Sequence, residues 1–175
     1  LASDGKTRPL RYVGTDPSVF QQVFERMELV DGTSIPAGQR GLLLSKLVYE
    51  DQLKLKSARG LDKLKSALAL RRASIATDPA LQRIVRENLT GIKEILLQLD
   101  AVKLERFRHR LQAFLHSQEQ DTAALLRELF ATSDANLAER HRFFYSELAP
   151  ELELYRVRIG EPLTVQALGR NGYVH

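Results

Sequence analysis

The feature that most constrains the fold is a long central stretch, residues 46–149, in which apolar residues recur at helical spacing between turn signals. Patterns typical of β-strands occur only on either side of it, near residues 10–13, 40–45 and 157–168. Neighbouring amphipathic helices joined by short turns normally pack antiparallel. We therefore predict an α+β fold, predominantly helical, in which a small strand-bearing base is interrupted by a bundle of about four or five helices.

The predicted strands carry different patterns. Gly41-Leu-Leu-Leu44 is a continuous apolar run between a loop and Ser45, which is typical of a strand buried on both faces. Near the end of the chain, apolar and polar residues alternate up to Leu168, and Asn171-Gly172 suits a tight hairpin turn. We predict three parts: residues 1–45 as the first part of the base, 46–149 as the helical insertion, and 150–175 as the second part of the base.

Helix boundaries are predicted from capping residues and from the phase of the apolar stripes. Ser45 is expected to cap a first helix from Lys46 to about Ile75, continuous unless Gly60 bends or breaks it. Thr77-Asp-Pro79 restarts the helical pattern with a cap and a proline in the first turn.

The second half of the stretch contains further boundaries. The stripe slips in phase at Asp100, which predicts a turn there, with a bend at Gly91 as the alternative. Asp121 is expected to cap the next helix, Ser133-Asp134 to cap the last one, and Pro150 to end it.

Positive charge is concentrated at the start of the helical stretch. Residues 46–75 carry eight Lys and Arg against three acidic residues, a net +5, while the whole chain carries +4. A basic helix can bind phosphates, anionic lipid headgroups or acidic proteins, although a solvated face with i,i+4 ion pairs is the commoner explanation. The candidate partner-binding residues are Lys54, Lys56, Arg59, Lys63, Lys65, Arg71 and Arg72.

Catalytic and metal-binding patterns are missing from the sequence. The chain has no cysteine, no Gly-x-Ser-x-Gly nucleophile turn and no glycine-rich phosphate loop. His109 and His116 lie seven residues apart, without a carboxylate pattern that would complete a metal site. We therefore predict a non-enzymatic domain with no catalytic, cofactor-binding or metal-binding residues.

The ends of the sequence suggest a fragment of a longer protein. No apolar run approaches the ~18–20 residues that a membrane-spanning helix needs, and the first residues lack the apolar core of a signal peptide. Because the sequence starts at Leu1 and stops just after a hairpin signal, it resembles an excised fragment, and this pattern is compatible with membrane segments outside it.

Four motifs at the two ends carry a resemblance to a known family. They are Tyr12-Val-Gly-Thr-Asp-Pro-Ser-Val-Phe20, Val30-Asp-Gly32, Gly41-Leu-Leu-Leu-Ser45 and Val157-Arg-Ile-Gly-Glu-Pro-Leu-Thr-Val165. In this order they resemble the extracytoplasmic domain of ABC-transporter permeases of the MacB/LolC/FtsX type, and Arg170-Asn-Gly-Tyr-Val174 is similar to the turn after its last strand. The sequence departs from that family by placing a long helical insertion before the last motif.

The resemblance implies a function for the whole chain. It implies a non-catalytic domain on the periplasmic side of the inner (plasma) membrane, attached through membrane helices to a cognate ABC ATPase. Such a domain would bind a partner or cargo protein, such as a lipoprotein, and transmit ATPase-driven motion, without a cofactor or nucleic acid. The alternative is a helical adaptor that binds acidic protein, anionic lipid or nucleic acid through its basic helix 46–75, with affinity falling steeply as salt is raised.

Overall fold

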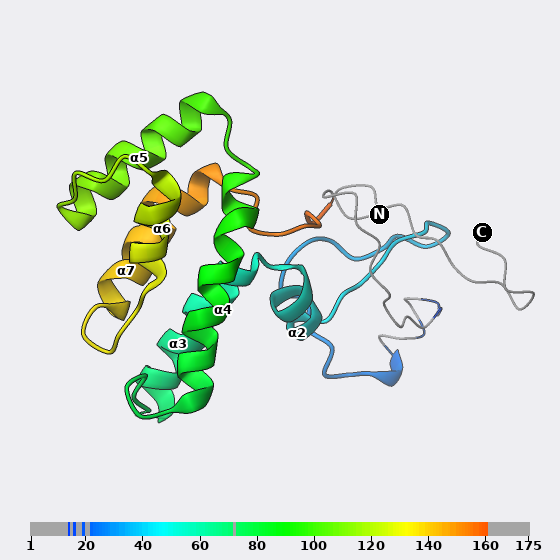
Figure 1. Ribbon diagram of the computed structural model, residues 1–175. Coiled ribbons are helices and arrows are strands. Elements are labelled where there is room, and N and C mark those ends of the chain that lie inside the picture. Colours follow the sequence, from blue (N-terminus) through cyan, green and yellow to red (C-terminus); the bar gives the residue numbers. More distant parts are fainter. Residues whose placement is uncertain (1–13, 15, 17–18, 20–21, 72, 161–175) are drawn as a thin grey trace, which may run out of the picture. The chain divides into compact units, whose positions relative to one another are not determined.

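The computed structural model describes residues 14, 16, 19, 22–71 and 73–160 of the chain (Figure 1). The chain divides into two compact units. Residues 1–53 together with 155–175 form one, which we call the flanking unit, and Lys54–Leu154 form the other, which we call the helical unit.

The described residues of the helical unit contain five α-helices, a π-helical turn and a 3-10 turn, connected by short segments (Figure 1). In chain order these are α3 (Lys56–Arg71), α4 (Pro79–Leu96), α5 (Ala101–Leu115), α6 (Thr122–Phe130), α7 (Leu137–Phe143), η2 (Phe144–Leu148) and η3 (Ala149–Glu151).

Aspartate side chains begin three of these helices, and two of these caps, at Asp78 and Asp121, agree with the sequence prediction. Asp78 accepts a hydrogen bond from the Ala80 amide at 2.8 Å and caps α4. Asp100 accepts from the Lys103 amide at 2.8 Å, and Asp121 accepts from the Ala123 amide at 2.9 Å. Each bond satisfies an amide that has no acceptor within its own helix. The predicted turn near residue 100 is confirmed, because α4 has ended and Asp100 starts α5.

The predicted cap of the last helix is wrong, because Asp134 has another role. Asn136 is the residue before α7, and its side-chain oxygen accepts a hydrogen bond from the Ser133 amide at 2.8 Å. Asp134 instead accepts from the Ser74 hydroxyl at 2.5 Å and from the Ile75 amide at 2.7 Å. The hydrogen bond from Ser74, and to a lesser extent the one from the Ile75 amide, lowers the pKa of the Asp134 carboxyl. The same two bonds tie the α6–α7 connection to the α3–α4 connection.

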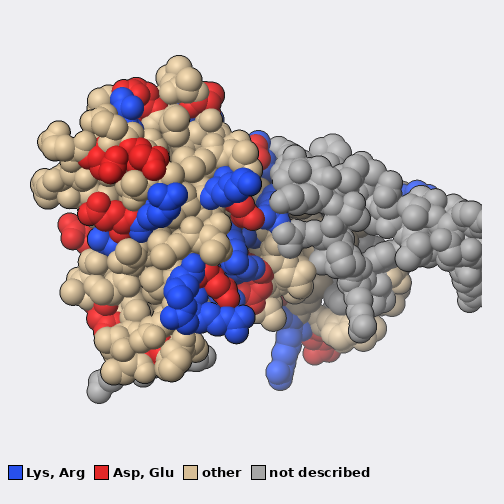
Figure 2. Space-filling view, viewed as in Figure 1, with Lys and Arg blue, Asp and Glu red and all other residues tan. Residues whose placement is uncertain are grey.

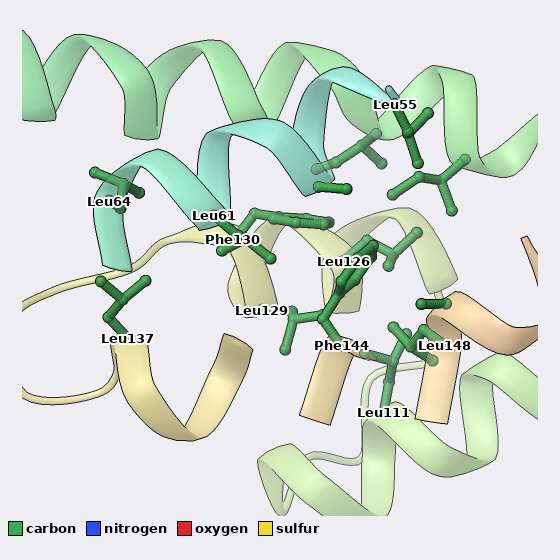
Figure 3. Close-up of a cluster of buried hydrophobic side chains, with 14 of the residues drawn as sticks. Leu55, Leu61, Leu64, Leu111, Leu126, Leu129, Phe130, Leu137, Phe144 and Leu148 are labelled. Atoms are coloured by element: carbon green, nitrogen blue, oxygen red, sulfur yellow. The ribbon is translucent and has the colours of Figure 1, made fainter. Parts of the chain in front are cut away.

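The core lies between α3, α4, α5, α6 and the last helical segments, and Figure 3 shows apolar side chains from several of them pointing toward one another. Apolar residues recur at helical spacing along each helix, so each helix buries one face against its neighbours. The largest fully buried side chains are Phe107, Phe130, Phe144, Leu61, Leu64, Ile95, Leu111, Leu125, Leu126, Leu129, Leu137 and Leu148.

Small residues allow α3 and α4 to pack closely. A Cβ atom on Gly60 would lie 1.9 Å from the Asn88 side-chain oxygen, so any other residue at this position would clash. Gly91 faces Ser57, where an added Cβ would lie at an ordinary contact distance of 3.6 Å. Gly60 and Gly91 are therefore packing positions inside continuous helices, and the sequence-based expectations of bends at these two glycines are wrong.

The predicted helix from Lys46 to Ile75 is interrupted before α3. Ser45 caps α2 (Lys46–Val48) as predicted, by accepting from the Val48 amide at 3.2 Å, and the π-helical turn η1 (Tyr49–Leu53) follows. Helical structure stops there and resumes at Lys56. Leu53 and Leu55 are both buried, at 2% and 3% exposed, a spacing of two that belongs to extended chain.

The two ends of the helical unit lie side by side. The Leu55 amide donates a hydrogen bond to the Leu154 carbonyl at 2.6 Å. Near the C-terminal end of the unit, the Glu153 amide donates to the side-chain oxygen of Gln98 at 2.8 Å, directly after α4. The helical unit therefore starts and finishes at one place.

Within the flanking unit, the segments on either side of the insertion also pair. The Arg156 amide donates to the Leu53 carbonyl at 3.0 Å. The rings of Tyr49 and Tyr155 stack with centroids 4.5 Å apart, and the Tyr155 hydroxyl donates to the carboxylate of Glu50 at 2.8 Å. The pKa of the Tyr49 hydroxyl is raised, mainly because burial removes the hydroxyl from water and to a lesser extent because of the negative charge of Asp31.

The predicted α+β fold class is wrong for the described residues, which are helical and contain no β-strand. Residues 40–45 have no regular secondary structure, and Leu42 and Leu43 are 40% and 42% exposed, not buried on both faces. An apolar run does not specify a strand unless a second segment supplies its backbone hydrogen bonds. Residues 157–160 of the last predicted strand form bends and a turn, whereas residues 10–13 and 161–168 lie outside the described residues. The predicted division into domains at residues 45 and 150 stays a prediction.

Candidate functional site

The seven basic residues selected from the sequence do not form one surface. Lys54 precedes α3, Lys56, Arg59, Lys63, Lys65 and Arg71 lie on α3, and Arg72 lies outside the described residues. Spacings of three and four residues place Lys56, Arg59 and Lys63 along one face of α3, whereas Lys65 lies on another face. We call Lys56, Arg59 and Lys63 the basic row.

Acidic residues of α4 moderate the charge of this row. Arg83 donates a hydrogen bond to the Glu87 carboxylate at 2.8 Å, which is the largest cause of a lowered pKa of Glu87. The charges of Lys56 and Arg59 lower the same pKa further, so α4 places a carboxylate beside the row. In the view of Figure 2, Lys and Arg side chains of the helical unit are mixed with Asp and Glu and do not form a single basic patch.

Lys54 belongs to a cluster of polar side chains that the sequence pattern did not reveal. Its ammonium group lies 2.7 Å from the carboxylate of Asp62 on α3. The same carboxylate accepts a hydrogen bond from the Tyr145 hydroxyl at 2.9 Å and lies 3.0 Å from Nε2 of His141 on α7. We call these four residues the Asp62 cluster. It joins the first segment of the helical unit to two helices that are distant from each other in the sequence.

The cluster is largely withdrawn from water. The side chains of Lys54 and His141 are 9% and 13% exposed, while that of Asp62 is 33% exposed. Lys54 Nζ also lies 5.7 Å from the centre of the Tyr145 ring, within the range of a cation–π interaction. Burial, followed by the negative charge of Asp62, raises the pKa of the Tyr145 hydroxyl well above its ordinary value. Tyr145 therefore stays protonated and acts as a donor to Asp62 near neutral pH.

The geometry favours a structural role for the Asp62 cluster over a catalytic one. Three donors converge on one carboxylate, so its oxygens are occupied by groups of the protein itself. Two surface hollows, of about 370 and 520 Å³, are lined by other residues, around His116 and around Phe24. A substrate binds in a concave site beside a reactive group. Neither of these two hollows is lined by a residue of the Asp62 cluster.

The two histidines considered as metal ligands lie on or after α5. His109 is exposed and lies 3.0 Å from the carboxylate of Glu105, while His116 ends α5 in a left-handed backbone conformation. Among the described residues, no group of three or more metal-binding side chains comes together.

Some signals for the Asp62 cluster are visible in the sequence with hindsight. His141 and Tyr145 are four residues apart and so share one face of a helical segment. The ring of Tyr145 packs against the ring of the buried Phe144. What the sequence lacks is the packing of α7 against α3, which brings Asp62 to this face.

Comparisons of the chain with protein-family models, with curated proteins and with solved structures found no match. In the described residues, no helix has both the length and the apolar character that crossing a membrane requires. The resemblance to permease domains consequently depends on the motifs at the two ends of the sequence.

Proposed function

We propose that the chain is a non-catalytic extracytoplasmic domain of an ABC-transporter permease of the MacB/LolC/FtsX type. The helical unit would be an inserted module that binds a partner protein. The observation that carries this proposal is the pairing of the unit's ends, where the Leu55 amide lies 2.6 Å from the Leu154 carbonyl. Domains tolerate insertion where the inserted chain leaves and returns at one place.

The order of the end motifs supports the permease assignment. The motifs precede Lys46 or follow Arg156, so the helical unit separates them and contains none of them. The described residues contain no strand, and the proposal therefore depends on motif order and not on a sheet.

The basic row is the surface we propose for partner contact. Lys63 is exposed and Lys56 and Arg59 are half-buried, so their charged groups can reach an acidic protein surface. Lys54 is not part of this surface, because its ammonium group is buried against Asp62. Electrostatic complementarity of this kind chiefly raises association rates and specificity.

The permease assignment is tested in the full-length protein. We expect apolar segments of about 20 residues on both sides of this sequence and a neighbouring ATPase gene. A topology reporter inserted beside Gln118, in the α5–α6 connection, should be active only on the extracytoplasmic side. Absence of the flanking segments, or a cytoplasmic reporter, would contradict the assignment.

Partner contact is tested separately by photo-crosslinking in cells that produce the full-length protein. A crosslinking residue in place of Lys63 should capture a partner, whereas one in place of Glu139, an exposed position on α7, serves as the matched control. Charge reversal of Lys56 and Arg59 should reduce capture at Lys63. Equal capture at both positions would contradict a partner-binding role of the basic row.

The adaptor hypothesis is tested by the dependence of binding on salt concentration. Its continuous basic helix 46–75 is interrupted after Leu53, which reduces the length of the charged surface that it requires. Binding of anionic vesicles or a polynucleotide that disappears between low and high salt would favour the adaptor over a protein partner.

A further inference from the structure

We propose that Asp62 forms a latch that holds the first segment of the helical unit, Lys54–Leu55, against the helices. Breaking it would open this segment while the core of the unit stays folded. The geometry that points to the latch is the convergence of Lys54, His141 and Tyr145 on one carboxylate. This inference does not depend on the permease assignment or on any partner.

One side of the latch is a cation that is largely withdrawn from water. The Lys54 side chain is 9% exposed, and its ammonium group lies 2.7 Å from Asp62. A cation withdrawn from water is strongly destabilising unless a carboxylate or several acceptors compensate for its lost hydration. Removing the Asp62 charge takes away a carboxylate that compensates Lys54, so the segment that carries Lys54 is held less firmly against the helices.

Few backbone contacts hold the Lys54–Leu55 segment in place. Lys54 and Leu55 lie between η1 and α3, and the Leu55 carbonyl accepts a hydrogen bond from the Arg59 amide of α3 at 3.0 Å. The Leu55 amide bonds to the Leu154 carbonyl, and the Leu55 side chain is 3% exposed. Opening therefore breaks the bond to Leu154, frays the first turn of α3 and exposes one leucine, whereas global unfolding exposes the whole core. Two processes of such different extent can be separated by amide hydrogen exchange.

The other side of the latch is part of the packed helices. Asp62 is anchored on α3, and His141 and Tyr145 belong to α7 and η2. The two aromatic rings lie against each other with centroids 4.7 Å apart, and Tyr145 also packs edge-on against the buried Phe144. This side is fixed by the core, so the Lys54–Leu55 segment is the part that moves when the latch breaks.

The consequence is a conformational device with two states. In the latched state, the Lys54–Leu55 segment is held against α3, α7 and η2. In the open state, the same segment is released from these helices and becomes flexible.

The test is hydrogen exchange of the complete chain, measured at the Leu55 amide and at core amides such as Leu64 and Leu126. In Asp62→Asn, which keeps the shape but removes the charge, we expect the Leu55 amide to exchange about tenfold faster or more. The core amides should keep their rates. Glu87→Gln, which breaks the exposed Arg83–Glu87 pair, is the matched control and should change neither.

A double variant identifies the buried cation as the cause. Lys54→Met keeps the apolar stem of the side chain and removes the charge, so Lys54→Met/Asp62→Asn should exchange more slowly at Leu55 than Asp62→Asn alone. A residue that contributes only to general packing would show no such rescue.

Tyr145→Phe is the second, milder variant, in case Asp62→Asn does not fold. It removes one donor and leaves the ion pair, so we expect a smaller increase that is again confined to Leu55. An unchanged Leu55 rate in these variants would overturn the latch. So would an increase of the same factor at Leu55, Leu64 and Leu126, because it would report global destabilisation.

Discussion

The helical unit and the described part of the flanking unit differ in how far they bury their apolar side chains. In the helical unit Leu61, Leu126 and Phe130 are completely buried. In the flanking unit Val23 and Val30 are 66% and 65% exposed. Helices can bury their apolar faces against helices nearby in the sequence, while an extended segment needs a remote partner. The comparison indicates that the helical unit contains what it needs to fold.

The strongest test of this difference is to separate the regions. A protein comprising only residues 54–154 should be helical and unfold cooperatively, because its core, its caps and both of its ends are internal to it. Far-UV circular dichroism during heating measures this. A broad, non-cooperative loss of signal would show that the helical unit depends on the flanking unit.

Core truncation should separate the regions by free energy. Phe130→Ala removes a ring that is 0% exposed and packs against Phe144, so we expect a loss of about 3–5 kcal/mol in the free energy of unfolding. Leu43→Ala, at a half-exposed position of the flanking unit, should cost less than about 1 kcal/mol. Urea denaturation of the complete chain measures both, and similar losses would contradict the comparison.

The two glycines between α3 and α4 offer a sharper test within the helical unit. Gly60→Ala places a Cβ 1.9 Å from the Asn88 oxygen and should destabilise the unit by about 1–3 kcal/mol. Gly91→Ala meets Ser57 at an ordinary 3.6 Å and should be neutral or stabilising by up to about 1 kcal/mol, because alanine favours helix. Denaturant midpoints of the two variants should therefore move in different directions, and a shift of both to lower denaturant would show that the crossing is tighter than described.

The smallest effect is expected at alkaline pH and concerns Tyr145. Burial and the Asp62 charge raise the pKa of its hydroxyl, so the folded chain keeps this proton after the unfolded chain has lost it near pH 10. The contribution of Tyr145 to stability is complete below pH 10 and declines as pH rises above it. The difference in tyrosinate absorbance between the native chain and Tyr145→Phe should appear well above pH 10, whereas in urea it should appear near pH 10. A native transition near pH 10 would contradict the burial of this hydroxyl.

Local patterns predicted the helices well because their causes are local. Asp78, Asp100 and Asp121 cap helices through bonds to amides two or three residues ahead, and the phase slip at Asp100 marks a real turn. The interruption at Lys54–Leu55 was missed because its cause, a bond to Leu154, is remote in the sequence.

Long-range contacts explain the other errors too. The Gly41–Leu44 run was predicted as a strand, but strands require a partner that no local pattern supplies. Asp134 was predicted as a cap, although Ser74 and Ile75 are its partners. The Asp62 cluster depends on the packing of α7 against α3, so the sequence alone does not show that its members lie close together.

The paired ends of the helical unit have a consequence for how the chain acquires its structure. Joining Leu53 to Arg156 through an unfolded loop of roughly 100 residues would cost about 4 kcal/mol in chain entropy. A folded helical unit removes most of this cost, because it presents Leu55 and Leu154 already side by side. The insertion thus acts on its neighbours as a short hairpin turn would, and the two flanking segments can meet quickly once the helices have formed.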